Sequence, residues 1–292
     1  MKETSVMADM LIEVLPYIQR FSGKTMVIKY GGAAMTSQEL KRSVMQDVAL
    51  MSKVGIKCVL VHGGGGEITH WMAKLGKEAT FREGLRVTDE ETMEIVQMTL
   101  CGGVNKEIVH LLNSFGVRAL GLSGFDAGIM KAKKAIGRDG VDLGRVGEVE
   151  KVEEESLKHF LQDGLVPVIA TVAPGEDDLP LNLNADHAAG AIAAALQALK
   201  LIVLTDVRGI LAKREDENSL ISQLSTEEAE TLLKQKQVDG GMIPKVQACL
   251  QSLRGQVEEA HIIDGRVPHA LLMEVFTDSG IGTMISQARR AP

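Results

Sequence analysis

Short runs of apolar residues recur along the chain and alternate with longer segments of helical periodicity. The runs are continuous, and they are Met26–Ile28, Cys58–Val61, Ala119–Leu122, Val166–Ile169, Leu201–Leu204 and His261–Ile263. Strands have this composition when both of their faces are buried, as in parallel sheets with helices on either side. The sequence therefore predicts an α/β fold, with an open and mainly parallel sheet sandwiched between helices.

Two segments lie outside this alternation. Residues 6–20 carry apolar positions at helical spacing, which predicts an amphipathic N-terminal extension helix that packs on another surface. Residues 125–150 are rich in glycine among alternating residues, which predicts hairpins over one end of the sheet. With the acidic loop Pro174–Pro180 as a joint, we expect three parts: the helix of residues 1–24, a lobe of residues 25–178 and a lobe of residues 179–292.

Composition excludes several classes of partner. The net charge is −7 and there is no block of lysine and arginine, which argues against nucleic acid or an anionic membrane as the main partner. No apolar run reaches the roughly 18 residues that span a bilayer. The three cysteines are unpatterned and predict neither disulfides nor a metal site. Acidic residues near the start are unlike a targeting leader, so we expect a cytoplasmic protein, or a plastid one if a leader has been removed.

Two of the predicted strands end in glycine-rich turns, where open α/β sheets bind ligands. The first continues as Lys29-Tyr30-Gly31-Gly32, and the second as His62 followed by four glycines and a helix. Glycines let backbone amides approach a phosphate, and Lys29 adds a positive charge beside them. The standard phosphate-loop and dinucleotide motifs are not present. Either turn alone could be only a tight turn, but the two together could hold both ends of a transferring phosphoryl group.

Three further segments supply side chains suited to anions. Asp186 opens a helix of small residues, where it could orient lysines or simply cap the helix. Lys245 lies in a first helical turn after Gly240-Gly241, a position that opposes the helix dipole unless the lysine serves an anion. Arg86 precedes another helix, and its guanidinium suits bidentate capture of a carboxylate. A lone arginine is otherwise usually a solvated surface residue.

Taken in order, these segments resemble the amino-acid kinase family, and within it the N-acetylglutamate kinases. The matching stretches span nearly the whole chain and include KTMVIKYGGAAM, VLVHGGGGEI, GLRVTDEETMEIV, NLNADHAAG, LTDVRGIL, GGMIPKV and IIDGRVPHALLMEVFTDSGIGTMI. The resemblance implies transfer of a phosphoryl group from ATP to the γ-carboxylate of N-acetyl-L-glutamate in arginine biosynthesis. It implies that residues 25–178 bind the acceptor and dimerise, and that residues 179–292 bind the nucleotide and arginine.

The resemblance also implies roles for individual residues. Lys29 and Lys245 would neutralise the phosphoryl group in flight, and Asp186 would hold both lysines in place. The other implied residues line the path of the two substrates: Gly64, Gly65, Arg86 and Asn182 for the acetylated amino acid, and Gly31, Gly32, Thr205 and Asp206 for the phosphates and nucleotide. Mg²⁺ would be bound mainly by phosphate oxygens, without a dedicated protein metal site.

The two ends of the chain resemble the arginine-inhibited, hexameric branch of these kinases. That branch implies a trimer of dimers interlaced by N-terminal helices, with L-arginine bound between that helix and the C-terminal lobe. His261, Glu274 and Gly280 match the arginine-site positions, and Lys213 and Tyr17 are weaker matches. Alone, His261 would more readily be a core histidine. The stretches KYGGAAM and LPYIQRFSGKT resemble cyanobacterial and plastid members, which bind a PII-type signal protein.

Two alternatives stay open at this level: a related kinase for aminoadipate or free glutamate, and a non-catalytic arginine-sensing subunit. Four positions also depart from the residues usual in the family, namely Gly66, Gly103, Phe125 and Arg145. None of them removes a proposed catalytic group, but they bear on substrate affinity and efficiency.

Overall fold

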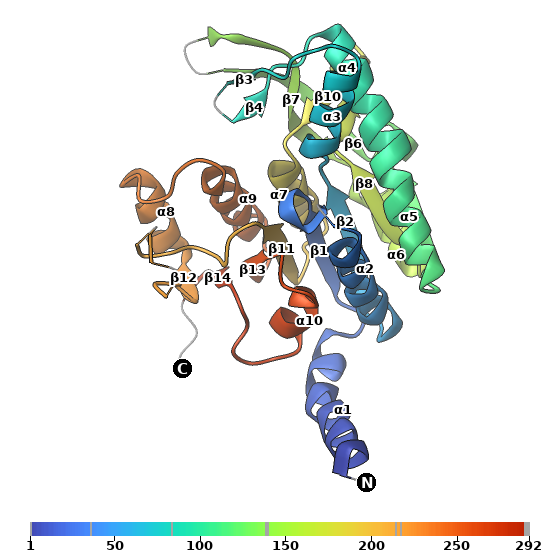
Figure 1. Cartoon of the computed structure of the whole chain (residues 1–292), viewed down its shortest axis with the longest axis vertical. Coiled ribbons are helices and arrows are strands. Elements are labelled where there is room, and N and C mark those ends of the chain that lie inside the picture. Colours follow the sequence, from blue (N-terminus) through green and yellow to red (C-terminus); the bar gives the residue numbers. More distant parts are fainter. Residues whose placement is uncertain are drawn as a thin grey trace.

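A computed structural model describes residues 2–288, except positions 36, 83, 138, 139, 214 and 217. Its centre is an eight-stranded sheet in the order β12-β14-β13-β11-β1-β2-β8-β5 (Figure 1). All six predicted strands lie in this sheet and pair in parallel: β1 (Thr25–Tyr30), β2 (Lys57–His62), β5 (Ala119–Leu122), β8 (Val166–Ala170), β11 (Lys200–Thr205) and β13 (Glu259–Asp264). The predicted α/β fold class is confirmed.

The sheet separates two apolar cores, which explains why most residues of its inner strands are apolar. Successive residues of a strand point to opposite faces, so Val27 enters one core and Ile28 the other. The first core is covered by α6 (Glu154–Gln162), α7 (Ala185–Ala195), α8 (Thr226–Lys234) and α9 (Met242–Arg254). The second core is covered by α2 (Gln38–Lys53), α5 (Asn105–Ser114) and α10 (Ala270–Val275).

A smaller sheet stands over the carboxyl ends of the central strands, at the top of Figure 1. Its order is β6-β7-β10-β9, formed by β6 (Met130–Ile136), β7 (Asp142–Val152), β9 (Val172–Pro174) and β10 (Pro180–Leu183). The antiparallel pair β6–β7 confirms the predicted hairpin. The loop between Pro174 and Pro180 closes a second hairpin, β9–β10, and thus turns the chain back within this sheet. The lobe boundary at residue 178 stays a prediction.

The remaining elements frame the same end of the sheet or extend the molecule. Beside the small sheet lie α3 (Gly65–Lys74), α4 (Glu90–Gln97) and the ribbon of β3 (Phe81–Arg82) with β4 (Leu85–Arg86). Sequence patterns missed β12 (Gln223–Ser225) and β14 (Thr283–Ser286), which extend the sheet beyond β13. The predicted N-terminal helix is α1 (Lys2–Phe21), and it projects from the body (Figure 1). Among the described residues, no helix has the length and apolar character needed to cross a membrane.

Candidate functional site

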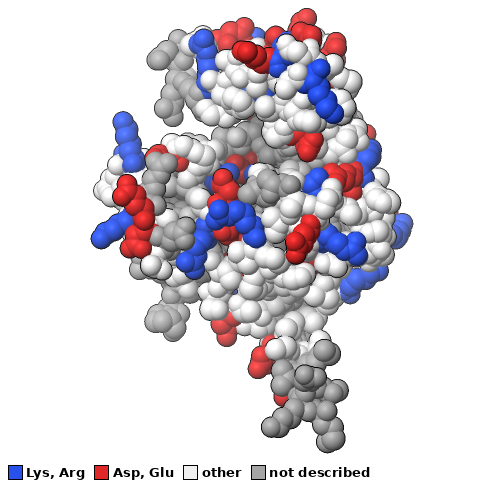
Figure 2. Space-filling model, viewed as in Figure 1, with Lys and Arg blue, Asp and Glu red and all other residues white. Residues whose placement is uncertain are grey.

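Two cavities meet at the carboxyl end of β1. The first has a volume of about 530 Å³ and lies between the second glycine turn, the β3–β4 ribbon and the start of α7. The second has a volume of about 600 Å³ and lies between the ends of β1 and β11 and the start of α9. Lys29, Gly31 and Gly32 line both cavities. In the space-filling view, the surface is hollowed below the upper end of the molecule (Figure 2).

A buried carboxylate joins two lysines at this junction. The Oδ1 atom of Asp186 lies 3.0 Å from Nζ of Lys29, and its Oδ2 atom lies 3.0 Å from Nζ of Lys245. The three side chains come from α7, β1 and α9, which are far apart in the sequence. They meet because α7 packs against both β1 and α9. The structure thus brings together the three residues that the sequence analysis proposed for phosphoryl transfer.

Burial and neighbouring charge set the ionisation of this cluster. Burial raises the pKa of Asp186, but attraction to Lys29 and Lys245 outweighs it, so the pKa ends below its ordinary value. The pKa of Lys29 is lowered by burial, and the Asp186 charge only partly opposes that shift. Asp186 is therefore a carboxylate at neutral pH, suited to holding cations and not to taking a proton.

The glycine turns present backbone to the cavities. A Cβ atom on Gly31 would lie 3.3 Å from Nζ of Lys29, and a Cβ on Gly64 would lie 2.6 Å from Leu100. Gly32 has a φ of 61°, a left-handed conformation that favours glycine. Gly64 is the N-cap residue of α3 and has no side chain that could accept a hydrogen bond from the first-turn amides, such as that of Gly65. Such amides attract anions.

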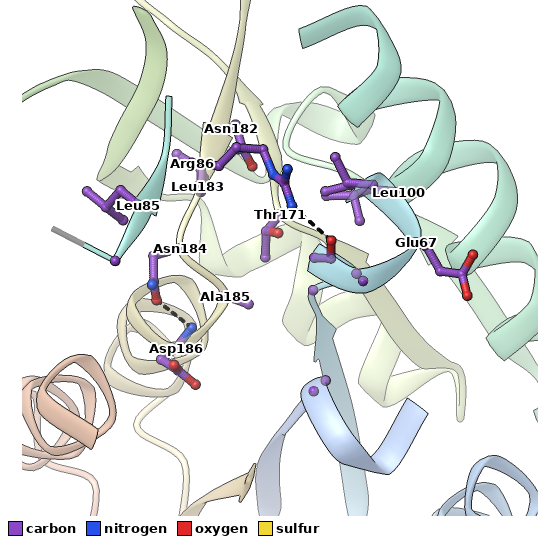
Figure 3. A pocket seen from close by; sticks show the side chains of 18 of the residues that line it. Glu67, Leu85, Arg86, Leu100, Thr171, Asn182, Leu183, Asn184, Ala185 and Asp186 are labelled. Atoms are coloured by element: carbon purple, nitrogen blue, oxygen red, sulfur yellow. Dashed lines mark hydrogen bonds between the residues drawn. The ribbon is translucent and has the colours of Figure 1, made fainter. Parts of the chain in front are cut away.

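Arg86 and Asn182 lie on the far wall of the first cavity (Figure 3). Arg86 is 7% exposed, and its guanidinium donates to the Gly65 carbonyl over 2.9 Å and to Oγ1 of Thr69 over 2.7 Å. Its plane also lies over the Phe81 ring at 4.7 Å. Asn182 donates to Thr88 Oγ1 over 3.3 Å. These contacts hold a cationic fork at the cavity end opposite the lysines.

The second cavity has polar groups at the end of β11. Thr205 is buried and donates to Oδ1 of Asp206 over 3.1 Å. Val207, Ile210 and Met242 add apolar lining beside them. Mixed apolar and polar walls of this kind suit a base and a sugar, with Lys245 at the end that faces the first cavity.

The predicted arginine-site residues form a separate cluster. Nδ1 of His261 lies 2.6 Å from Oε1 of Glu274, whose Oε2 accepts from the amides of Ile281 and Gly282. A Cβ on Gly280 would lie 2.9 Å from Glu274 Oε2. These residues are not among those that line the two cavities, as far as the chain is described.

Tyr17 and Lys213, the weaker matches to the arginine site, and Arg145, which departs from the residue usual in the family, each have hydrogen-bond or ion-pair partners. Tyr17 on α1 donates to Asp278 over 2.5 Å, and Asp278 lies between Glu274 and Gly280 in the chain, whereas the Lys213 amide donates to the Ser219 hydroxyl. Arg145 forms ion pairs with Asp177 at 2.6 Å and with Glu90 at 3.6 Å. Arg145 therefore ties the small sheet to its own hairpin loop and to α4.

Sequence reasoning missed a polar network beneath the second glycine turn. His62 and Asn105 are buried in contact with each other at the ends of β2 and α5. The only local signal is a histidine directly before the glycines. Its partner is contributed by a helix from another part of the chain.

Comparison with known proteins decides the family. A model of the amino acid kinase family matches residues 24–264. The chain is a member of that family. Within it, the acetylglutamate kinase of Caldanaerobacter subterraneus subsp. tengcongensis is 52% identical over 280 residues, which cover 96% of this chain and 93% of the relative. Other acetylglutamate kinases, such as that of Synechococcus sp., are equally similar, so the predicted membership among the acetylglutamate kinases is confirmed.

Solved structures agree with the fold. The N-acetylglutamate synthase of Neisseria gonorrhoeae, solved with coenzyme A and N-acetyl-glutamate, has 27% identity and a TM-score of 0.86 over 97% of this chain. This chain spans 64% of that synthase, which has also been solved with coenzyme A and L-arginine. Carbamate kinase from Giardia lamblia bound to AMP-PNP has 17% identity and a TM-score of 0.66, and it supports the fold alone.

Proposed function

We propose that this kinase transfers the γ-phosphoryl group of ATP to the γ-carboxylate of N-acetyl-L-glutamate. The observation that carries the proposal is that two cavities share Lys29, Gly31 and Gly32 and meet at the lysine–aspartate–lysine cluster. A donor in one cavity and an acceptor in the other would place the transferring group at this junction. Relatives at about half identity named acetylglutamate kinase favour this acceptor over aminoadipate or free glutamate.

The acceptor would lie in the first cavity, with one carboxylate toward Arg86 and the other toward the junction. Its reacting carboxylate oxygen would attack the γ-phosphorus as the bond to the β,γ-bridging oxygen breaks, giving an acyl phosphate and ADP. A carboxylate nucleophile has no proton to lose, so no general base is required. Lys29 and Lys245 would neutralise the charge in flight, Asp186 would hold them, and the glycine amides would donate to the same oxygens.

The nucleotide would occupy the second cavity, close to Thr205 and Asp206. Among the described residues, no group of three or more His, Cys, Asp or Glu side chains could hold a metal ion. The cavity does offer the carboxylates of Asp206 and Asp239, and Mg²⁺ commonly binds through one or two carboxylates together with substrate phosphates. Bound Mg²⁺ would neutralise charge on the β- and γ-phosphates of ATP.

The test is ATP-dependent phosphorylation of N-acetyl-L-glutamate, trapped as the hydroxamate, with aminoadipate and glutamate as alternative acceptors. We expect turnover on the acetylated acid and at most a trace on the others. Replacing Lys245 by methionine should lower kcat about 100-fold or more, the usual cost of losing one transition-state contact. Equal turnover on all three acids, or an unchanged kcat in the variant, would contradict the proposal. A wholly inactive wild-type protein would favour the arginine-sensing alternative.

We further propose L-arginine as an inhibitor bound at Glu274, His261 and Gly280. A glutamate suits the guanidinium chemically, and the Tyr17–Asp278 contact would link such a site to α1. Saturating arginine should lower activity and raise the melting temperature, because a ligand of the native state stabilises it by mass action. Glu274→Gln should remove both effects. If arginine still lowered the activity and raised the melting temperature of Glu274→Gln, arginine would have to bind elsewhere.

We also propose that the chain forms a hexamer through contacts made by the surface of α1. Met10, Leu11 and Ile12 are 59%, 69% and 68% exposed on this projecting helix, so a partner helix would bury them. Leu11→Glu should lower the mass measured by light scattering from six chains to fewer, while the exposed Glu13→Gln should leave it unchanged. A PII-type partner and a cytoplasmic or plastid location stay predictions of the sequence.

A further inference from the structure

His62 ends β2 directly before the second glycine turn and is completely buried. Its Nδ1 lies 2.9 Å from the carbonyl oxygen of Gly63, and its Nε2 lies 3.1 Å from Nδ2 of Asn105. His62 is not among the described residues that line either cavity. Any effect of His62 on the reaction would therefore be indirect, through the glycine turn that follows it.

The surrounding hydrogen bonds determine which ring nitrogen carries the proton. Asn105 Nδ2 donates to the Val168 carbonyl over 2.8 Å, and Asn105 Oδ1 accepts from Lys106 Nζ over 3.0 Å. An amide nitrogen only donates, so His62 Nε2 accepts from it and the hydrogen lies on Nδ1. Nδ1 then donates to the Gly63 carbonyl, which only accepts. Burial lowers the pKa of His62 to about 4, so the ring stays neutral at pH 7.

The sheet is shaped to admit the Asn105 side chain. A Cβ on Gly121 of β5 would lie 2.1 Å from Asn105 Oδ1. Only a glycine leaves the carboxamide room to reach both Val168 of β8 and His62 of β2. Asn105 itself is 1% exposed, so its hydrogen bonds are all to the protein. The network is thus a built feature of the sheet end and not a surface contact.

The geometry of the Gly63–Gly64 peptide links the position of the His62 ring to the first cavity. The described peptide bonds include no cis bond, and in a planar trans peptide the carbonyl and the following N–H point in opposite directions. Holding the Gly63 oxygen against the buried ring therefore directs the Gly64 N–H away from it. Gly63 and Gly64 both line the first cavity, beside Lys29.

We propose that Asn105 and His62 are positioning residues, which fix the Gly63–Gly64 peptide so that the Gly64 amide donates to the transferring phosphoryl group. This inference rests on the proposed kinase function. Asn105 determines that Nδ1 of His62 carries the hydrogen. That Nδ1–H holds the Gly63 carbonyl in place, and the planar peptide then sets the direction of the Gly64 N–H. Neither side chain touches the substrates.

Two substitutions of His62 separate hydrogen bonding from packing. The amide nitrogen of asparagine can occupy the place of Nδ1 and donate to Gly63, whereas glutamine reaches only the place of Nε2. Both variants lose the ring. His62→Asn should keep kcat within about fivefold of wild type, and His62→Gln should lower kcat about 10- to 100-fold. The KM for ATP should stay unchanged in both, since the second cavity is not altered. Melting temperatures of both variants and the exposed control His159→Asn show whether they are folded.

Asn105→Asp replaces the amide donor that faces His62 by an acceptor of nearly the same shape. A carboxylate accepts, so His62 should carry its proton on Nε2 and lose its bond to Gly63. Proton–nitrogen correlation spectra of the imidazole should show Nδ1–H in wild type and Nε2–H in the variant, with a similar fall in kcat. An Nε2–H wild-type ring, or equal losses in His62→Asn and His62→Gln, would overturn the proposal. An inactive wild-type protein would overturn the kinase function instead, while the substrate-free spectrum still decides the tautomer.

Discussion

Replacing Asp186 by asparagine is the sharpest test of the lysine–aspartate–lysine cluster. The substitution keeps the shape of the side chain and removes one charge. Each ion pair spans 3.0 Å, and at an effective dielectric constant near 20 one such pair is worth about 5 kcal/mol of attraction. Measured losses on removing one partner of a buried pair are about 3–5 kcal/mol. We expect the free energy of unfolding, measured in urea, to fall by about that amount.

The same substitution should change the reaction and its pH dependence. Without the carboxylate, the two lysines repel each other at the junction of the cavities and are no longer held toward the transferring group. We expect kcat to fall at least about 100-fold. The pKa of Lys29, already lowered by burial, loses its compensating attraction and falls further. A lysine loses its charge above its pKa, so the residual activity should decline as pH rises, at lower pH than in wild type.

The assay compares wild type, Asp186→Asn and the control Asp163→Asn, which changes an exposed aspartate at the end of α6. Hydroxamate formation gives kcat between pH 6 and 9, and urea titration gives stability. The control should match wild type in both. If Asp186→Asn kept more than a third of the wild-type kcat, the cluster would not hold the catalytic charges. Unchanged stability would refute the calculated strength of its ion pairs.

Three further predictions test other parts of the structure. Arg86→Lys should raise the KM for N-acetyl-L-glutamate about 10- to 100-fold in steady-state kinetics, because a lysine cannot form the bidentate fork. Gly144→Ala should destabilise more in urea than Gly140→Ala, since both have positive φ but only the Gly144 Cβ would lie 2.1 Å from the Thr88 carbonyl. Burial raises the pKa of Asp47 to about 6, so its protonation stabilises the fold fully below about pH 4, and that contribution is lost as pH rises through 6. Asp47→Asn should flatten this dependence.

The sequence predicted the sheet because its signal is local. The inner strands of the sheet are buried on both faces, and that burial favours runs of apolar residues along them. The edge strands β12 and β14 have no such signal. Gln223 is exposed at the start of β12, and Met284 of β14 is only partly buried. A short run with one open face cannot be distinguished from a loop by composition. For the same reason, the short strands of the hairpin β9–β10 were not predicted, and only the polar turn between them was recognised, as a loop.

The site was less predictable because it is assembled by topology. Lys29, Asp186 and Lys245 come from distant segments, and no periodicity in the sequence shows that α7 packs between β1 and α9. The family resemblance supplied that grouping. Neither the residues nor the resemblance indicated a role for Asn105, because that role depends on a helix side chain that enters the sheet through the space left by Gly121. A glycine inside a strand is the one clue, and it signals a close approach without naming the partner.

The position of His261 and Glu274 constrains how the proposed inhibition by arginine would work. His261 is on β13, and its neighbour Lys200 begins β11, whose opposite end, Thr205, lines the second cavity, where we propose that ATP binds. His261 pairs in register with Ile202, three residues before Thr205, so the two positions are roughly 10 Å apart along the sheet. Neither His261 nor Glu274 lines the second cavity, so arginine bound at them would not overlap ATP in that cavity. Inhibition from there would have to act through the sheet that carries both sites, by shifting β11 or the helices on it relative to β1. Because Lys29 is on β1 and Lys245 on α9, such a shift would change the spacing between the two lysines, and kcat would then respond to arginine more strongly than the KM for ATP.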